Sequence, residues 1–282
     1  MFTTLISPAD LAAHIDDPDL VIVDCRFTMS DTSQGEREYA EGHVPGARYA
    51  HLDNDLSGPM TGDNGRHPLA SPAEIRARFS ALGIRPGTQV VAYDGDTGMF
   101  AVRLWWMLRW LGHDAVAVLD GGFTAWTAAG LPVRAGEESW ERSDFTGEPR
   151  PGWCLTADDV QATLGDASVL LVDARTRDRY RGIGETLDPV GGHIPGAASH
   201  HFGNNLTEQK TFKSPDTLRA EWSATLGDHA PDAVIMYCGS GVTACHNLLA
   251  LEHAGLHGAR LYAGSWSEWC ADPTRPVSTD DE

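Results

Sequence analysis

Short apolar runs alternate with longer amphipathic segments along the whole chain. Runs with the length and β-branched content of buried strands occur at 20–24, 89–93, 116–119, 169–173 and 233–237. Helix-like segments occur at 7–14, 71–82, 103–111 and 243–254, and Ser214-Pro215 opens another. Ser7-Pro8 and the capping box beginning at Ser71 are typical helix starts. Apolar strands that alternate with helices predict an α/β fold, a parallel sheet covered by helices on both faces.

The same pattern is written twice. VIVDCR at 21–26 returns as LLVDAR at 170–175, and GHVPGA at 42–47 returns as GHIPGA at 192–197. VVAYDGD at 90–96 parallels VIMYCGS at 234–240, and GGFTAW at 121–126 parallels AGSWSEW at 263–269. Four matches in one order, at a nearly constant and domain-sized spacing, indicate a duplicated domain.

The repeat divides the chain into two predicted domains, residues 1–135 and 154–282. The stretch from 132 to 153, PVRAGEESWERSDFTGEPRPGW, is rich in charge, glycine and proline, which is typical of a connection. We therefore predict a linker over 136–153. A length of 282 residues suits two domains of this size.

Charge narrows the choice of partners. The chain carries 40 acidic and 21 basic residues, a formal net charge of −19. Such a surface repels a phosphate backbone, so we expect no nucleic-acid partner. An anionic substrate would need a local group of basic residues.

Other features favour a cytoplasmic protein that needs no metal. The N-terminal sequence MFTTLISPADLAAHIDD lacks the basic and apolar regions of a signal peptide, and no run approaches the roughly 20 apolar residues of a membrane span. The 5 cysteines are scattered, with no CxxC pair or metal-ligand spacing. We expect free thiols in a reducing cytoplasm, and neither a metal site nor a membrane partner.

One cysteine lies where chemistry is expected. Cys238 follows the apolar run AVIMY and precedes the loop GSGVT and a helix. In an open α/β sheet, ligands bind beyond the carboxyl ends of the strands, and a helix N-terminus favours negative charge. Gly239 and Gly241 let the backbone curl around the sulfur. A lone cysteine is usually a small buried hydrophobe, but this context predicts a nucleophilic thiolate.

These motifs together resemble a known family. The loop CGSGVTA, the D-x-R after a strand, the GH[IV]PGA segments and the duplicated layout resemble tandem-domain rhodaneses over nearly the whole chain. The loop is most similar to that of 3-mercaptopyruvate sulfurtransferases, because thiosulfate sulfurtransferases more often carry basic residues after the cysteine. The resemblance implies that only the second domain is catalytic, since Asp94 stands in the first copy where Cys238 stands in the second.

A cysteine phosphatase is the rival from another class, because small cysteine phosphatases also place a cysteine loop before a helix. They need an arginine that closes the loop and holds phosphate in a bidentate manner. Here Thr243, Ala244, Cys245 and His246 follow the glycines, with no arginine. The sequence therefore gives the phosphatase little support.

The resemblance also implies residues that bind the donor. It places a carboxylate-binding arginine at Arg179, and the loop residues Gly239, Gly241, Val242 and Thr243 around the sulfur. Without the resemblance, a surface ion pair is the simpler interpretation of Arg179. Mercaptopyruvate enzymes often have a second arginine before GHIPGA, but this chain reads GETLDPVGGHIPGA, and Arg181 is the expected substitute.

A proton relay is the last implied feature. The resemblance joins Ser240 to Asp53 and His67 of the first domain. A hydroxyl beside the nucleophile can pass a proton, although a loop serine commonly binds local backbone groups, and Asp53 and His67 suit solvated loops equally well. Asp173 is expected to fasten the turn after its strand and to orient Arg179.

The expected function is sulfur transfer from 3-mercaptopyruvate to a thiol, such as thioredoxin or glutathione, or to cyanide, through a persulfide on Cys238. No cofactor is expected, and the protein is expected to be a monomer or a weak dimer. Two alternatives stay open: thiosulfate as the donor, and a persulfide carrier that serves a partner protein.

Overall fold

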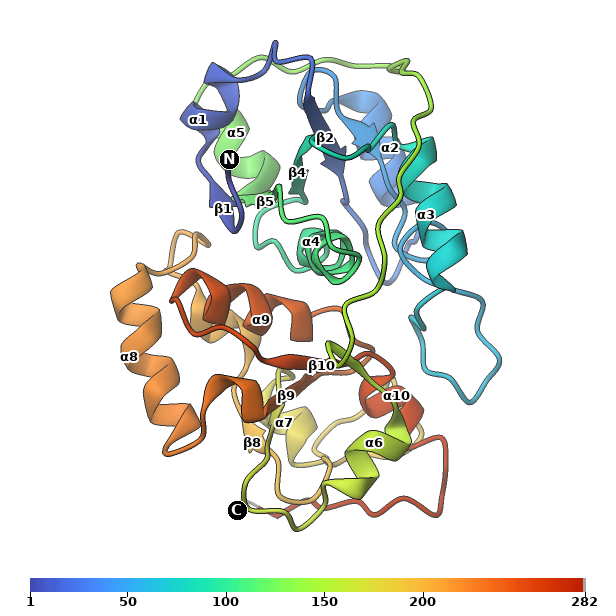
Figure 1. Ribbon diagram of the computed structural model, residues 1–282, viewed down its shortest axis with the longest axis vertical. Helices are drawn as coiled ribbons and strands as arrows, with labels where there is room; N and C mark the ends of the chain where they lie inside the picture. Colours follow the sequence, from blue (N-terminus) through green and yellow to red (C-terminus); the bar gives the residue numbers. More distant parts are fainter. Residues whose placement is uncertain (281–282) are drawn as a thin grey trace. The chain divides into compact units, whose positions relative to one another are not determined.

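The first half of the chain forms a five-stranded parallel sheet in the computed structural model, which describes residues 1–280 (Figure 1). The strand order is β1-β5-β4-β2-β3. In chain order the strands are β1 (Leu5–Ile6), β2 (Leu20–Asp24), β3 (Arg48–Tyr49), β4 (Gln89–Tyr93) and β5 (Val116–Leu119). β2, β4 and β5 have the predicted bounds, and the two-residue edge strands are additions.

The second half repeats this sheet. Its order is β6-β10-β9-β7-β8, which is the same topology in the second set of strands. They are β6 (Cys154–Leu155), β7 (Leu170–Asp173), β8 (Ala198–Ser199), β9 (Val234–Tyr237) and β10 (Arg260–Tyr262). The register repeats as well, since Asp24 pairs with Tyr93 and Asp173 with Tyr237. The predicted tandem α/β fold is confirmed.

Helices connect the strands in both halves. The first half contains α1 (Pro8–Ala13), α2 (Gln34–Glu41), α3 (Pro72–Ala81), α4 (Ala101–Trp110) and α5 (Gly122–Ala128). The second contains α6 (Ala157–Ala162), α7 (Arg177–Tyr180), α8 (Pro215–Leu226), α9 (Ala244–His253) and α10 (Ser265–Trp269), with 3₁₀ turns at Phe202–Asn205 and Pro231–Ala233. Ser7 and Ser71 are the observed N-caps, and Ser71 forms the predicted capping box with Glu74.

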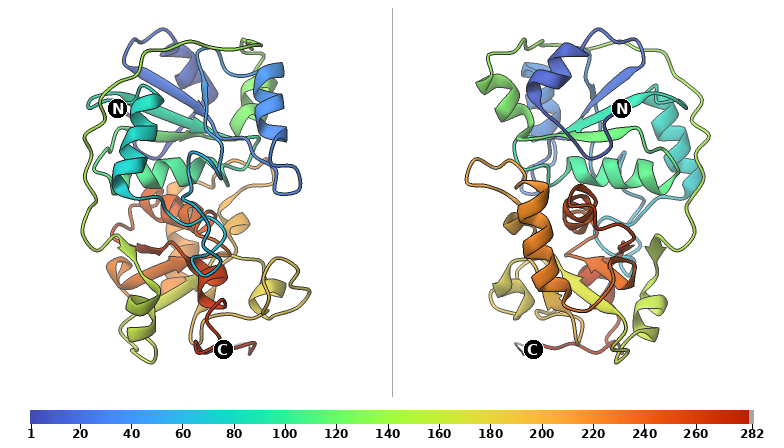
Figure 2. Two further views of the ribbon diagram at one scale, coloured as in Figure 1. Left: turned by 90° about the vertical axis from the view of Figure 1, so that its right-hand side faces the viewer. Right: turned by 60° about the vertical axis from the view of Figure 1, so that its left-hand side comes forward.

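Both faces of each sheet are buried. In the first sheet, Ile22 and Val91 belong to one apolar cluster with Tyr39 of α2 and Trp126 of α5. The neighbouring strand residues, which pleating directs to the other face, are buried too, and α4 packs against β4 and β5. In the second half, α8 and α9 lie side by side, as Figure 2 shows.

The chain forms two compact units that do not follow the repeat strictly. Met1–Gly58, Ala70–Arg150 and Glu208–Phe212 form the first unit. Pro59–Leu69, Pro151–Thr207 and the chain from Lys213 onward form the second. The segment Pro59–Leu69 comes from the first half of the sequence and packs within the second unit. The domain limits 1–135 and 154–282 remain predictions.

Within residues 1–280, no helix combines the length and the apolar character needed to cross a bilayer.

Candidate active site

Cys238 lies directly after β9, buried at the start of the loop that leads into α9. The beginning of α10 fastens this loop. Trp266 N–H donates to the carbonyl of Cys238 at 3.0 Å, and Ser267 N–H donates to the carbonyl of Gly239 at 3.0 Å. Gly241 has φ +75°, and a Cβ there would lie 2.2 Å from the carbonyl oxygen of Ala263, so only glycine fits. The loop is therefore held in one shape by its surroundings.

Ser265 holds the backbone of the cysteine by a hydrogen bond, and the sequence analysis missed it. Its backbone has φ +55°, a left-handed conformation that costs a residue with a Cβ about 1–2 kcal/mol. Its buried hydroxyl accepts the N–H of Cys238 at 3.1 Å and donates to the carbonyl of Tyr262 at 2.9 Å. The repeat held a signal, because Gly122, with φ +59°, occupies the matching position of the first copy.

Ser240 and His67 meet beside this loop. His67 Nδ1 lies 2.7 Å from Ser240 Oγ, and both side chains are buried. His67 comes from the segment 59–69 of the second unit. Asp53, the third residue of the expected relay, belongs to the first unit. There its backbone N–H donates to His51 Nδ1 at 3.1 Å, and burial raises the pKa of its carboxyl group.

Arg179 of α7 is held by two acids of the loop that follows the helix. Its Nε donates to Glu185 Oε2 at 2.9 Å, and its Nη2 donates to Asp188 Oδ2 at 3.0 Å. Burial alone would raise the pKa of Glu185, but hydrogen bonds from Arg179 and from the backbone N–H of Leu187 lower it below its usual range. Glu185 is therefore a charged partner of this arginine.

The expectation that Asp173 orients Arg179 is wrong. The carboxylate of Asp173 pairs with Arg175 Nη2 at 2.6 Å, fully buried, and Arg175 also donates to the carbonyl of Gly192. The first copy contains the same pair, Asp24 with Arg26 at 2.6 Å. This D-x-R pair fastens the turn after the strand, and two different acids hold Arg179.

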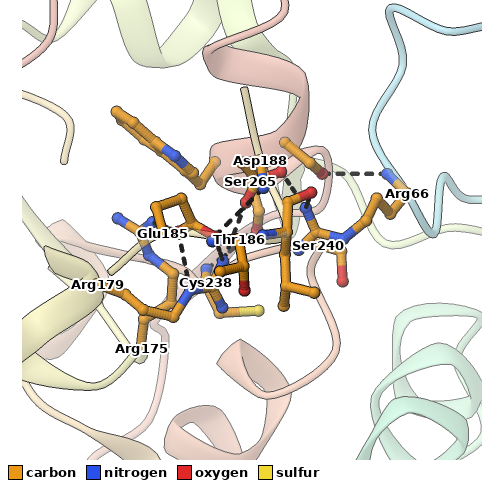
Figure 3. A network of polar contacts seen from close by, with 12 residues as sticks. Arg66, Arg175, Arg179, Glu185, Thr186, Asp188, Cys238, Ser240 and Ser265 are labelled. Carbon is orange, nitrogen blue, oxygen red and sulfur yellow. Dashed lines mark hydrogen bonds and ion pairs between the residues drawn. The ribbon is translucent and has the colours of Figure 1, made fainter. Parts of the chain in front are cut away.

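Arg66 is a second functional candidate that the sequence analysis missed. Its Nη1 forms an ion pair with Asp188 Oδ1, so Asp188 joins Arg66 to Arg179 (Figure 3). Its backbone N–H donates to Ser267 Oγ at 3.0 Å. Burial raises the pKa of Asp188, although both arginines act against that rise. No local pattern marks Arg66, because its partner lies 122 residues along the chain.

Val242 and Thr243 belong to the first turn before α9. The carbonyl of Val242 accepts the N–H of Cys245, and that of Thr243 accepts the N–H of His246, each at 3.1 Å. Thr243 is the N-cap residue, and its side chain forms no cap hydrogen bond. Cys245 is buried, with Sγ 3.3 Å from the carbonyl of Gly241, which agrees with a packing role.

The matching loop of the first unit holds a carboxylate. Asp94 Oδ1 accepts the backbone N–H groups of Asp96 and Gly98, and Oδ2 accepts those of Phe100 and Ala101, at 2.8–3.3 Å. Burial raises the pKa of Asp94, while these four donors lower it. The backbone of this loop therefore forms a ready-made anion site that its own side chain fills.

The structure of this loop changes the alignment of the two copies at one position. Counted from Asp94, the sequence places Thr97 opposite Gly241, which suggests that the first loop lacks the second glycine. The first loop is one residue longer, and Gly98 takes the left-handed conformation, with φ +77° against +75° at Gly241. The two loops therefore share their backbone turn.

All 5 cysteines are free thiols. Among residues 1–280, no group of three or more His, Cys, Asp or Glu side chains is arranged to hold a metal ion.

Comparison with known proteins identifies the family. The model of the rhodanese-like domain matches the chain twice, at residues 7–129 and 156–272. A probable 3-mercaptopyruvate sulfurtransferase of Pseudomonas aeruginosa is 50% identical over 279 residues, covering 98% of both chains. A putative thiosulfate sulfurtransferase of Mycobacterium tuberculosis is 40% identical over 280 residues, covering 97% of this chain and 96% of the relative.

Solved structures agree. The 3-mercaptopyruvate sulfurtransferase of Leishmania major superposes with a TM-score of 0.84 at 32% identity, covering 95% of this chain and 74% of that one. The 3-mercaptopyruvate sulfurtransferase of Escherichia coli superposes with a TM-score of 0.82 at 30% identity, covering 95% of this chain and 100% of that one. The chain belongs to the family of tandem rhodanese-domain sulfurtransferases.

Proposed function

We propose that the enzyme transfers sulfur from 3-mercaptopyruvate to a thiol or cyanide through a persulfide on Cys238. The observation that carries the proposal is the uncharged loop Cys238–Thr243 with a serine–histidine hydrogen bond, Ser240 to His67, at its side. A donor that arrives as a thiol must lose a proton, and a hydroxyl bound to an imidazole can take part in that loss.

The proposed first step balances as follows. The thiolate of Cys238 attacks the donor sulfur, the new S–S bond forms, and the C–S bond of the donor breaks. The electron pair of that bond leaves on carbon as the enolate of pyruvate. The enolate takes up one proton, which equals the proton lost by the donor thiol. In the second step, an acceptor thiol, such as that of thioredoxin or glutathione, or cyanide attacks the outer sulfur and restores the thiolate.

Each neighbour has a proposed role. Ser240 and His67 move the donor proton, with Asp53 as the acidic end of the relay. Arg179 binds the donor carboxylate, for which a guanidinium group has the right geometry. The backbone N–H groups of the loop, supplied by Gly239, Gly241, Val242 and Thr243, stabilise negative charge on the sulfur. The chemistry needs no metal ion and no organic cofactor.

Thiosulfate is the second candidate donor, supported by the name of the Mycobacterium tuberculosis relative. In that case Cys238 attacks the outer sulfur of thiosulfate, and sulfite leaves with the electron pair of the broken S–S bond. No residue of the loop itself is charged, which favours mercaptopyruvate, because thiosulfate carries two charges on a compact group and gains most from cations within the loop.

One experiment separates the candidates. Intact mass after donor exposure should show one added sulfur atom, which a thiol then removes. Steady-state kcat/KM should be higher for 3-mercaptopyruvate than for thiosulfate, with one common acceptor. The opposite order would assign thiosulfate. A persulfide that forms readily but turns over slowly with every small acceptor would indicate a carrier that serves a partner protein.

A further inference from the structure

Ser265 has a backbone conformation that a side chain disfavours. Among residues 1–280, only two residues other than glycine have a left-handed φ, Lys210 at +63° and Ser265 at +55°. Lys210 is exposed, whereas Ser265 begins α10 and is completely buried. A strained residue persists only where its surroundings fix it, and such residues gather at functional sites. Ser265 is therefore a candidate for a role in the reaction.

The first copy makes the same turn without this strain. Gly122 stands at the position of Ser265 with φ +59°, which glycine adopts freely. In each copy, the next two residues donate their N–H groups to the carbonyls of the first two loop residues at 2.8 to 3.0 Å: Phe123 and Thr124 to Asp94 and Gly95, and Trp266 and Ser267 to Cys238 and Gly239. Glycine suffices for these backbone bonds, so they do not account for a serine.

The hydroxyl of Ser265 adds a contact that glycine cannot make. It accepts the backbone N–H of Cys238 at 3.1 Å, as Figure 3 shows, and it donates to the carbonyl of Tyr262 at 2.9 Å. Because Trp266 N–H also binds the carbonyl of Cys238, the peptide groups on both sides of the Cα atom of Cys238 are held. These two groups fix the direction of the Cα–Cβ bond, and the sulfur lies one bond beyond it.

The two copies need different positioning because their first side chains differ. The carboxylate of Asp94 accepts four backbone N–H groups, which hold it directly. A thiol sulfur is a weak hydrogen-bond acceptor, so donors around the sulfur hold it less firmly than they hold a carboxylate. The position of Cys238 Sγ therefore depends more on the backbone of Cys238, which Ser265 holds.

We propose that Ser265 is a positioning residue for sulfur transfer, and that its strained conformation is kept so that its hydroxyl can direct the sulfur of Cys238 toward the donor. This inference rests on the proposed function and extends it. Attack along the line of the breaking bond tolerates little displacement, and a misplacement of about 1 Å costs on the order of a hundredfold in rate. Since every donor meets the same sulfur, the effect should not depend on the donor.

The test measures the first step alone, as the rate of sulfur uptake after rapid mixing with donor, followed by intact mass. Ser265→Ala and Ser265→Gly both remove the hydroxyl. We expect each to lower the limiting rate constant about ten- to a hundredfold, by the same factor with 3-mercaptopyruvate and with thiosulfate. Each chain should still take up one sulfur, and the donor concentration that gives half the limiting rate should change by less than about threefold.

Stability separates this role from a structural one. Ser265→Ala keeps the strained conformation and Ser265→Gly relieves it, so the glycine variant should have the higher midpoint of urea unfolding of the two. Both should lose the same rate, because both lack the hydroxyl. A rate constant that recovers with stability in Ser265→Gly would reduce Ser265 to a structural residue. Uptake by fewer chains at the wild-type rate constant would do the same.

Ser265→Thr is the rescue variant, because it keeps the hydroxyl and adds a branched Cβ that the left-handed conformation disfavours. It should be less stable than wild type and yet keep the rate constant within about threefold. A folded Ser265→Thr that is as slow as Ser265→Ala would refute the role of the hydroxyl. If Ser265→Thr does not fold, the comparison of the alanine and glycine variants still decides.

Ser223→Ala is the matched control. Ser223 is an exposed serine of α8, and its hydroxyl also donates to a backbone carbonyl, that of Arg219, at 2.7 Å. The variant should take up sulfur at the wild-type rate with both donors.

The use of two donors keeps this inference separate from the proposed function. If wild type takes sulfur only from thiosulfate, and both Ser265 variants slow that uptake tenfold or more, the role of Ser265 stands and the proposed donor is wrong. If wild type takes sulfur from 3-mercaptopyruvate and both variants do so at the wild-type rate, the role of Ser265 is refuted and the proposed function stands.

Discussion

The loops that begin at Asp94 and at Cys238 share a backbone turn but begin with different side chains. In both, the carbonyl of the first residue accepts an N–H from the following short helix, from Phe123 in the first unit and from Trp266 in the second. In the first loop, four backbone N–H groups bind a carboxylate that the chain itself supplies. In the second loop, the first side chain is the thiol of Cys238, on which we propose that the persulfide forms. The fold therefore provides the same backbone turn in both units, and in the first unit the side chain of Asp94 fills the anion site that this turn forms.

The surroundings of the two loops differ in charge. Tyr39 and Tyr180 match in the two copies, since their hydroxyls donate to the carbonyls of Ala47 and Ala197. Glu38 therefore stands in the first copy where Arg179 stands in the second. Arg66 and Arg179 lie over the second loop. An enclosed carboxylate needs no further cation, whereas a loop that receives an anionic donor, as we propose for Cys238, gains from nearby positive charge. The comparison predicts that changing the first side chain alone does not convert one loop into the other.

The largest expected effect is the loss of the thiol. Cys238→Ser should abolish sulfur transfer with every donor, because a serine hydroxyl cannot form a persulfide. Cys245→Ser, seven residues along and also buried, should retain activity, since Cys245 lies in α9 and its thiol donates to the carbonyl of Gly241. Intact mass after donor exposure is the measurement. Residual sulfur uptake in Cys238→Ser would move the chemistry to another cysteine.

The second effect is a loss of folding stability at low pH. The backbone N–H of His200 donates to the carbonyl of Asp173, and the backbone N–H of Ala50 donates to that of Asp24 in the first copy. Of these two matching residues, only His200 has a side chain that titrates. Burial lowers the pKa of His200 to about 4. Its unfolded pKa is about 6.5, so protons bind the unfolded chain first, and stability falls as the pH drops from about 6.5 to about 4. The expected loss is about 3 kcal/mol.

His200→Ala should flatten this pH dependence, whatever it does to stability at pH 7, because it installs the residue of the first copy. Urea unfolding at several pH values between 7 and 4 measures the slope. His257→Ala, which removes an exposed histidine, should keep the wild-type slope. An unchanged slope in His200→Ala would assign the acid sensitivity to other groups.

The third effect concerns Gly122, which matches Ser265 of the second copy and contacts the loop of Asp94. Gly122 has φ +59°, and a Cβ there would lie 2.6 Å from the carbonyl oxygen of Asp94. We expect Gly122→Ala to lower the free energy of unfolding by about 1–3 kcal/mol, since strain and contact add. Gly87→Ala, at φ +86° with open space around it, tests the strain alone and should cost less. Equal losses in urea unfolding would show that the contact with Asp94 is unimportant.

A smaller effect concerns removal of the proton from the donor thiol. Ser240→Ala should lower kcat for 3-mercaptopyruvate about tenfold, which corresponds to about 1.4 kcal/mol, and lower kcat for thiosulfate less, because thiosulfate brings no thiol proton. His67→Gln should act similarly, and the double variant should lose little more than either single one, since the two residues share one hydrogen bond. Strictly additive losses would separate their roles.

The smallest effect is expected for a variant that places a cysteine in the first loop, which should not gain sulfur transfer. Asp94→Cys, made in the Cys238→Ser background, should bind no sulfur after exposure to 3-mercaptopyruvate. The reason is not the backbone turn, which Gly98 makes, but the acidic Glu38 at the position that matches Arg179. A persulfide found by mass spectrometry on this variant would show that backbone N–H groups alone suffice.

Sequence reasoning worked where the signal was local. The apolar runs at 20–24, 89–93 and 116–119 became strands with those bounds, because each is buried on both faces. The edge strands escaped it because two residues carry no periodicity. Arg66 escaped it for another reason: its partner Asp188 is 122 residues away, and only the packing of the segment 59–69 brings them together. Ser265 could have been found, since its partner in the repeat is a glycine.

The segment Pro59–Leu69 has a consequence for whether either copy can exist alone. By sequence it belongs to the first copy, yet its residues His67 and Arg66 bind Ser240 and Asp188 of the second unit. A gene cut between the two copies would leave the second without either residue. The two halves of the gene therefore depend on each other, since the first half encodes side chains that hold residues of the second unit.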